Sequence, residues 1–146
     1  MSLLPSERLR AATLAVAAIG LGIATYLTYV HYAHVRPLCT TGGCEKVQTS
    51  SYAELAGVPV AVLGLAAYAV LVFLALMPGV AAALAGAAVA IGGTAFSGYL
   101  LWAQLARIHA ICQWCVGNDV VVVVVAALCV ARVIVEPDDG APRAPE

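Results

Sequence analysis

Long uncharged stretches alternate with short polar segments along the whole chain. Residues 11–30 and 55–106 carry no charged side chain, and residues 110–131 are interrupted only by Asp119. Because an α-helix rises about 1.5 Å per residue, about 20 apolar residues cross a hydrocarbon core of about 30 Å. Met77-Pro78-Gly79 divides the longest stretch, since proline and glycine end helices and form turns. The pattern predicts an all-α membrane protein, a bundle of four transmembrane helices at about 11–31, 57–77, 80–106 and 112–133.

Composition agrees with a single membrane domain, expected over residues 11–135. Hydrophobic residues make up 63% of the chain and charged residues 10%, with a mean hydropathy of +0.97, whereas soluble domains carry about 25% charged residues. The net charge of −1 offers no basic surface for nucleic acid. A cleaved signal peptide is disfavoured, because the first apolar run exceeds the usual ~7–15 residues. Residues 1–10 are expected to form a polar N-terminus, and the proline-containing segment 136–146 a disordered tail.

The number of predicted spans places four of the five cysteines together. An even number of spans puts both termini on one side of the membrane, and the loop 31–56 and the turn 107–111 on the other. Cys39, Cys44, Cys112 and Cys115 therefore face one compartment at one membrane surface. Cys129 lies about 21 Å deeper along a helix and is expected to be a buried apolar residue.

The distribution of arginine and lysine predicts the orientation. Four basic residues accompany the termini and three accompany the loops, and cytoplasmic segments carry the excess of basic residues. Paired cysteines also persist in oxidising compartments. We therefore expect a multi-pass protein of the cell (inner) membrane, with cytoplasmic termini and extracytoplasmic cysteines. The residues counted are Arg8, Arg10, Arg132 and Arg143 against Arg36, Lys46 and Arg107.

Two cysteine pairs carry the candidate chemistry. Cys112-x-x-Cys115 begins the fourth predicted helix, where backbone N–H groups stabilise a thiolate. Cys39 and Cys44 flank a loop whose glycines allow movement, and a loop dithiol beside a helix-end dithiol suits thiol–disulfide exchange. Static disulfides, or half of a zinc site at Cys112 and Cys115, are the alternatives.

Polar residues near these pairs are the candidate supporting groups. Asp119 follows Cys115 by one helical turn, and an acid within a span is usually functional or paired. It either contacts a reducible ligand, with Asn118, or stays hydrated near the surface and pairs with Arg107. Trp114 belongs to an interfacial aromatic belt or flanks a ligand ring. Ser51-Tyr-Ala-Glu54 fits a capping box and predicts a short helix in the loop.

Several motifs resemble those of the bacterial homologues of vitamin K epoxide reductase (VKOR). The resemblance runs from about residue 12 to 135 and includes four cysteines in the same order and the loop serine, Ser50. The matching stretches are Cys39…Gly42-Gly43-Cys44-Glu-Lys-Val, Ser50-Ser51-Tyr52-Ala53, Gly57-Val-Pro59, Gly64-x-x-x-Tyr68, Gly98-Tyr99-Leu-Leu-Trp-Ala-Gln104 and Ala110-Ile-Cys112-Gln-Trp-Cys115.

The resemblance implies a four-helix bundle around a quinone of the ubiquinone or menaquinone type. In that family the Cys-x-x-Cys pair exchanges electrons with the quinone, and the loop pair relays them from a thioredoxin-fold (DsbA-like) partner that oxidises secreted proteins. Carried over, Cys39 exchanges with the partner, Cys44 forms an interloop disulfide with Cys112, and Cys115 is the thiolate nearest the quinone. The expected quinone-binding or supporting residues are Ser50, Asp119, Asn118 and Trp114.

The chain departs from the animal enzymes of this family at two positions. Those enzymes hold the quinone carbonyls with an asparagine on the second helix and a tyrosine on the fourth, where this sequence has Val60 and Asp119. We therefore do not expect vitamin K epoxide to be a substrate, and Asp119 is a candidate replacement contact. Many bacterial members carry a fused thioredoxin-like domain after the fourth helix. Because this sequence ends at Glu146, its partner is expected to be a separate protein.

Three other interpretations compete with this one. Disulfide oxidases of the DsbB type carry their Cys-x-x-Cys pair in the first external loop, so the order of pairs here argues against them. A metal-binding membrane protein would use His31, His34 and the cysteines, whereas the redox interpretation expects no metal. A structural bundle would use the cysteines as two permanent disulfides.

Overall fold

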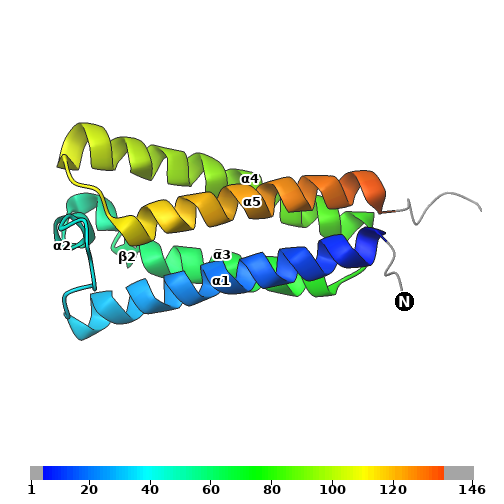
Figure 1. Cartoon of the computed structure of the whole chain (residues 1–146), viewed down its shortest axis with the longest axis horizontal. Coiled ribbons are helices and arrows are strands. Elements are labelled where there is room, and N and C mark those ends of the chain that lie inside the picture. Colours follow the sequence, from blue (N-terminus) through cyan, green and yellow to red (C-terminus); the bar gives the residue numbers. More distant parts are fainter. Residues whose placement is uncertain (1–4, 137–146) are drawn as a thin grey trace, which may run out of the picture.

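Four long helices lie side by side in the computed structural model, which describes residues 5–136 (Figure 1). They are α1 (Pro5–Ala33), α3 (Val60–Leu76), α4 (Val80–Ala103) and α5 (Gln113–Val135). Helices α1 and α5 and the helical segment Val80–Ile108 are long and apolar enough to cross a membrane, and α3 is a shorter apolar helix. The predicted fold class, an all-α membrane bundle, is confirmed. Of the tail predicted at 136–146, only Glu136 lies within the described residues.

Small residues allow these helices to approach closely. A Cβ atom on Gly20 would overlap the ring of Tyr68, and a Cβ atom on Gly93 would lie 3.2 Å from the Val122 side chain. Such close packing stabilises helix association in lipid, where there is no hydrophobic force between helices. Large apolar side chains such as Ile134 are exposed on the outside of the bundle, as lipid contact requires.

Arginine side chains close the end of the bundle near the two termini. Arg10 donates to the Leu76 carbonyl oxygen at 2.6 Å, and Arg132 donates to the Met77 carbonyl oxygen at 3.1 Å. Arg132 is buried and pairs with Glu136 at 3.4 Å. The last carbonyl groups of a helix have no partner within it. These arginine side chains therefore donate the hydrogen bonds that the carbonyl oxygens at the end of α3 would otherwise lack.

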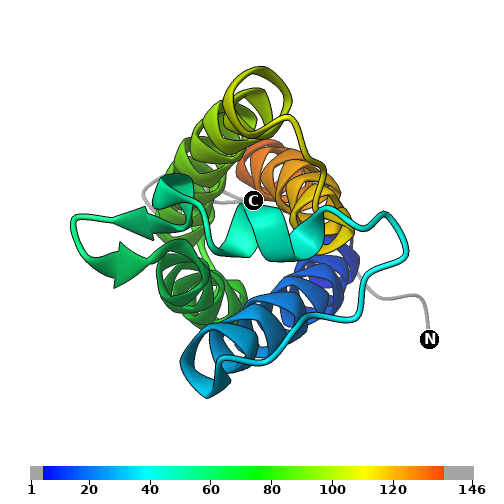
Figure 2. The ribbon, with the colours of Figure 1, turned by 90° about the vertical axis from the view of Figure 1, so that its left-hand side faces the viewer.

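The polar segment between α1 and α3 folds over the opposite end of the bundle. Helix α2 (Cys44–Gln48) lies across the end of the four long helices (Figure 2). It is followed by a single 3-10 turn, η1 (Ser51–Ala53), and a short antiparallel hairpin of β1 (Glu54–Leu55) and β2 (Val58–Pro59). The loop therefore covers this end of the bundle (Figure 2).

The short helix predicted from Ser51 lies elsewhere in the loop, at Cys44–Gln48. The predicted capping box is wrong, because Ser51 starts only a 3-10 turn and Glu54 begins a strand. Ala56 and Gly57 both have positive φ, 52° and 81°, which is the geometry of a two-residue hairpin turn. This turn pairs Glu54 with Pro59 and so removes Glu54 from any helix.

Candidate active site

The four cysteines predicted to share one membrane surface lie together at the end covered by α2. Cys39 and Cys44 form a disulfide, while Cys112 and Cys115 are free thiols. Cys44 and Cys112 are fully buried and belong to one apolar cluster. The expected disulfide between Cys44 and Cys112 is therefore not the one present. Gly42, with φ 74°, turns the chain between Cys39 and Cys44 and leaves their Cα atoms 6.0 Å apart, close enough to bridge.

The segment before α5 holds Cys112 in place. Helix α4 continues as one π-helical stretch, η2 (Gln104–Ile108), and His109 then reverses the chain in a left-handed conformation, with φ 53°. The buried side chain of Gln104 accepts a hydrogen bond from the Cys112 N–H at 2.8 Å. Cys112 is thereby held as the residue that precedes α5.

The two residues between Cys112 and Cys115 form hydrogen bonds with the loop that carries Cys39 and Cys44, here called the cysteine loop. Gln113 Oε1 accepts hydrogen bonds from the Thr40 N–H at 3.0 Å and the Thr40 hydroxyl at 2.6 Å. Trp114 Nε1 donates to the Leu38 carbonyl oxygen at 2.6 Å, and its ring packs on Tyr26 with centroids 4.7 Å apart. The segment beside Cys39 is therefore fastened to the start of α5.

Hydrogen bonds around the thiols favour a thiolate on Cys112. Gln48 Nε2 lies 3.9 Å from Cys112 Sγ and 3.6 Å from Cys115 Sγ. Cys112 precedes the spanning segment Gln113–Val135. A hydrogen bond from the Cys115 side chain, supported by Gln48 and backbone N–H groups, lowers the pKa of Cys112 to about 6, although burial acts in the opposite direction. A thiolate is the nucleophile in thiol–disulfide exchange.

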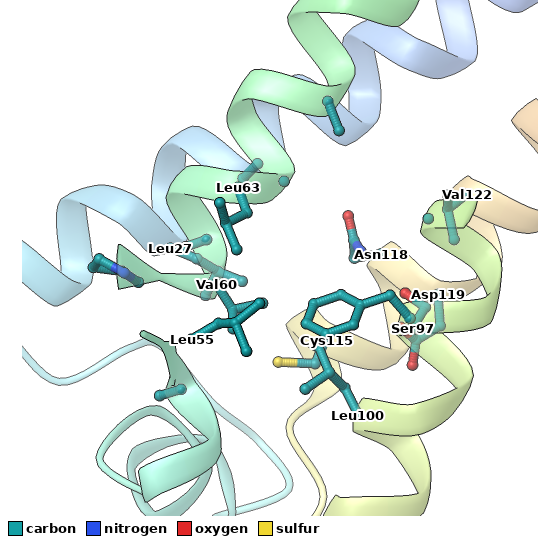
Figure 3. Close-up of a pocket in the computed structure, with 18 of the residues that line it drawn as sticks. Leu27, Leu55, Val60, Leu63, Ser97, Leu100, Cys115, Asn118, Asp119 and Val122 are labelled. Atoms are coloured by element: carbon teal, nitrogen blue, oxygen red, sulfur yellow. The ribbon is translucent and has the colours of Figure 1, made fainter. Parts of the chain in front are cut away.

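A cavity of about 350 Å³ lies within the bundle beside Cys115. The sulfur of Cys115 points into it, and the Asn118 amide projects into it from the same helix (Figure 3). Asp119 also lines it and lies beside the Ser97 hydroxyl. The other lining residues are mostly apolar, which is typical of small-molecule sites. They include Leu27, Leu55, Val60, Leu63, Phe96, Leu100 and Val122.

A comparison with protein families decides what kind of protein carries this site. The sequence model of the vitamin K epoxide reductase family matches residues 11–130. The chain belongs to this family. Membership of the VKOR family, together with the membrane-spanning helices and the Cys39–Cys44 disulfide, makes the protein a membrane oxidoreductase that acts on disulfides. No curated protein matches the chain.

The two positions at which the sequence leads us to expect a difference from the animal enzymes both line the cavity. Val60 lies on α3 and Asp119 on α5. The alternative pairing of Asp119 with Arg107 is not observed, because Arg107 lies over the ring of Trp102 at 5.5 Å. Ser50 lines the cavity as well, and its hydroxyl donates to the Val47 carbonyl oxygen at 2.7 Å. The cavity wall therefore carries an apolar side chain at Val60 and polar ones at Ser50 and Asp119.

The side chains of Trp114 and His31 both contact the segment between α1 and α3. Trp114 packs against the loop and is not among the residues that line the cavity, so it supports the site from outside. His31 pairs with Glu54 at 3.6 Å. Within residues 5–136, no three histidine, cysteine or acidic side chains gather where they could hold a metal ion.

Three glutamines of this VKOR site were not singled out from the sequence. Gln48 contacts both thiols, Gln104 orients Cys112, and Gln113 holds the loop. Gln104 ends one of the stretches that resemble the family, which was an available signal. Glutamine side chains otherwise carry no distinctive sequence pattern, because the role of each depends on which group distant in the chain it meets.

Proposed function

We propose that this protein is a quinone-dependent membrane thiol–disulfide oxidoreductase. It reoxidises a separate thioredoxin-fold (DsbA-like) partner and so supports disulfide formation in secreted proteins. The observation that carries the proposal is the division of one cysteine pair: Cys115 lines the cavity, whereas Cys112 shares a buried cluster with Cys44. Such a pair has one sulfur toward a ligand site and the other toward the loop disulfide, as electron relay requires.

Electrons pass between the pairs by thiol–disulfide exchange. A partner thiolate attacks Cys39 of the loop disulfide, and the partner's second thiolate resolves the mixed disulfide, which leaves Cys39 and Cys44 reduced. The Cys44 thiolate then attacks Cys112 of a Cys112–Cys115 disulfide, and Cys115 leaves as a thiolate. Attack of Cys39 on Cys44 restores the loop disulfide and frees Cys112. The observed loop disulfide beside two free thiols is the state expected after this transfer.

The cavity supports a quinone of the ubiquinone or menaquinone type as the electron acceptor. Its volume of about 350 Å³ falls within the roughly 300–1,000 Å³ of small-molecule sites, and its apolar lining suits a ring with an isoprenoid tail. Ser50, Asn118 and Asp119 supply polar groups on its wall. As the Cys112 and Cys115 thiols close to a disulfide, two electrons and two protons convert the quinone to a quinol. Val60 supplies no amide, so vitamin K epoxide is not the substrate we propose.

The surface around Cys39 suits an exchanging partner. Cys39 is half-buried, and the side chain of its neighbour Leu38 is 76% exposed. Ile111, whose carbonyl oxygen accepts a hydrogen bond from Thr41 in the same loop, has a side chain that is 45% exposed. These apolar groups would cover the partner's reactive cysteine. We place this end outside the cytoplasm and the termini inside, in the inner membrane. Arg10 and Arg132 at the other end, and the disulfide, which needs an oxidising compartment, support this orientation.

The test uses purified protein, a reduced thioredoxin-fold partner and a short-tailed ubiquinone or menaquinone. We expect one quinol for each partner disulfide formed. Cys115→Ala should abolish quinone reduction, whereas Cys129→Ala, which changes a buried cysteine outside the cavity lining, should retain it. A reduced partner that lacks its second cysteine should be trapped on Cys39 as a mixed disulfide, because its one thiolate attacks the Cys39–Cys44 disulfide, Cys44 leaves as a thiolate, and no second partner thiolate is present to resolve the bond. Turnover at the wild-type rate in Cys115→Ala would overturn the proposal.

A further inference from the structure

Two buried polar atoms on the cavity wall have no hydrogen-bond partner among residues 5–136. They are the hydroxyl oxygen of Tyr68 and Oδ2 of Asp119, and both side chains line the cavity. A buried polar group without a hydrogen-bond partner destabilises the fold, and native proteins contain few of them. Two such atoms on one cavity indicate that a bound molecule supplies the missing partner.

The two side chains reach the cavity from opposite walls. Tyr68 belongs to α3 and Asp119 to α5, and these helices lie diagonally across the bundle (Figure 2). Asp119 lies one helical turn after Cys115 on α5, and the side chains of Tyr68, Cys115 and Asp119 all line the same cavity. A group bound between Tyr68 and Asp119 would therefore also lie near the Cys115 sulfur.

Helix α1 holds the Tyr68 ring in its place. The ring is 3% exposed and lies directly on Gly20, so closely that a Cβ atom there would overlap it. A Cβ atom on Gly22, two residues further along α1, would meet no atom within 4 Å. The ring therefore cannot turn away to find another partner for its hydroxyl, and the hydroxyl is presented at a defined place on the wall.

We infer that Tyr68 and Asp119 form the end of the quinone site that binds a carbonyl oxygen and delivers a proton to it. This inference rests on the proposed function and adds Tyr68, a residue that neither the sequence nor the family comparison assigned to the site. Tyr68 donates a hydrogen bond to the carbonyl oxygen and positions it. Asp119, in its protonated form, is the catalytic acid.

The reaction balances with Asp119 as a carrier of one proton. Formation of the Cys112–Cys115 disulfide releases two electrons and two thiol protons, and the quinone takes up two of each as it becomes a quinol. Asp119 gives its proton to the carbonyl oxygen beside Tyr68 and regains one from the thiol pair. It lies four residues after Cys115, about 6 Å along the helix. Asp119 begins and ends each cycle protonated.

The test measures quinone reduction by the purified full-length protein with a reduced thioredoxin-fold partner and a short-tailed ubiquinone. In Asp119→Asn we expect kcat to fall by about 100-fold, the usual contribution of a general acid, with less change in KM. Asp119→Glu should recover most of the rate. Tyr68→Phe should raise KM for the quinone by about three- to tenfold, as expected for one neutral hydrogen bond, with little change in kcat. Tyr29→Phe, on an exposed ring, is the matched control.

A second measurement distinguishes a role of Tyr68 and Asp119 in quinone reduction from a purely structural role. The transfer of electrons from partner to Cys112 and Cys115, followed by thiol trapping without quinone, should be unchanged in both variants. Loss of this transfer in Asp119→Asn would show a structural role and overturn the inference. Wild-type KM and kcat in both variants would overturn it as well.

Failure of the proposed function is recognised separately, in the wild-type protein. Binding of the same quinone should raise the thermal stability of the detergent-solubilised wild type, and Tyr68→Phe and Asp119→Asn should reduce that increase. A wild type that binds the quinone but never reduces it would overturn the proposed function and the proton-delivering role. Equal stabilisation of all three proteins would overturn the binding role of the pair.

Discussion

A Cβ atom on Gly43 would lie 2.5 Å from the carbonyl oxygen of Ile111. The loop that carries Cys44 and the segment that carries Cys112 therefore meet backbone to backbone, at a distance that only glycine permits. Gly43 has φ −94°, an ordinary value for any residue, so the requirement is one of space. This contact allows Cys44 and Cys112 to share one buried cluster.

Replacing Gly43 by alanine should separate the two cysteine pairs. We expect partner-dependent quinone reduction by Gly43→Ala to fall by about 10- to 100-fold, because a displacement of about 1 Å between reacting groups can cost about 100-fold. Gly117→Ala is the control, since a Cβ atom there meets no neighbour. Reduction driven by a small dithiol that acts directly on Cys112 and Cys115 should be unaffected. Wild-type partner-dependent rates in Gly43→Ala would contradict the requirement for close approach.

Trp114→Phe should loosen the cysteine loop without removing the aromatic ring. The variant loses the hydrogen bond to the Leu38 carbonyl oxygen, and a neutral hydrogen bond contributes about 1 kcal/mol. Hydrogen exchange at the Thr40 amide should therefore become about fivefold faster. Trp102→Phe, which alters a ring stacked on Tyr99, should leave that amide unchanged. Unchanged Thr40 exchange in Trp114→Phe would mean that Gln113 alone holds the loop.

The Cys112 thiolate should depend on Cys115. The pKa of Cys112 lies at about 6, below its ordinary value of 9.0, so the thiolate forms as pH rises through that value. Cys115→Ala removes the largest stabilising hydrogen bond and leaves the effect of burial, which raises the pKa. In Cys115→Ala, the ultraviolet absorbance of the Cys112 thiolate should therefore appear at a higher pH than in wild type. Cys129→Ala should keep the wild-type midpoint of this titration. An unshifted midpoint in Cys115→Ala would mean that a group other than Cys115 lowers the pKa of Cys112.

Arg132→Met should destabilise the bundle at the end opposite the cysteines. It leaves Glu136 buried without its cationic partner, and removal of one member of a buried ion pair costs about 3–5 kcal/mol. The thermal unfolding midpoint in detergent should fall, and the double variant Arg132→Met/Glu136→Gln should recover part of the loss. Arg36→Met, in an exposed ion pair, should change the midpoint little. A midpoint equal to wild type in Arg132→Met would contradict a stabilising role for the pair.

Most of the architecture was predictable, because membrane spans are encoded locally. A chain in lipid must satisfy its backbone groups within each helix, so uncharged stretches broken by Met77-Pro78-Gly79 predict the helices directly. The order and spacing of the cysteines indicated the family, which the match over residues 11–130 confirmed. The loop was less predictable. Its short helix lies at Cys44–Gln48, because the turn at Ala56 and Gly57 draws Glu54 into a hairpin.

By itself, the sequence determined that the protein is a helical membrane bundle and that two cysteine pairs lie at one end of it. Both follow from how many apolar segments the chain contains and where its polar segments fall. Only the tertiary structure decided that Cys115 lines a cavity while Cys112 packs in the cluster with Cys44, and that Tyr68 and Asp119 line that same cavity from different helices. These relationships depend on how helices that are distant in the chain rotate and pack against one another. The hydropathy of a single segment does not specify that packing.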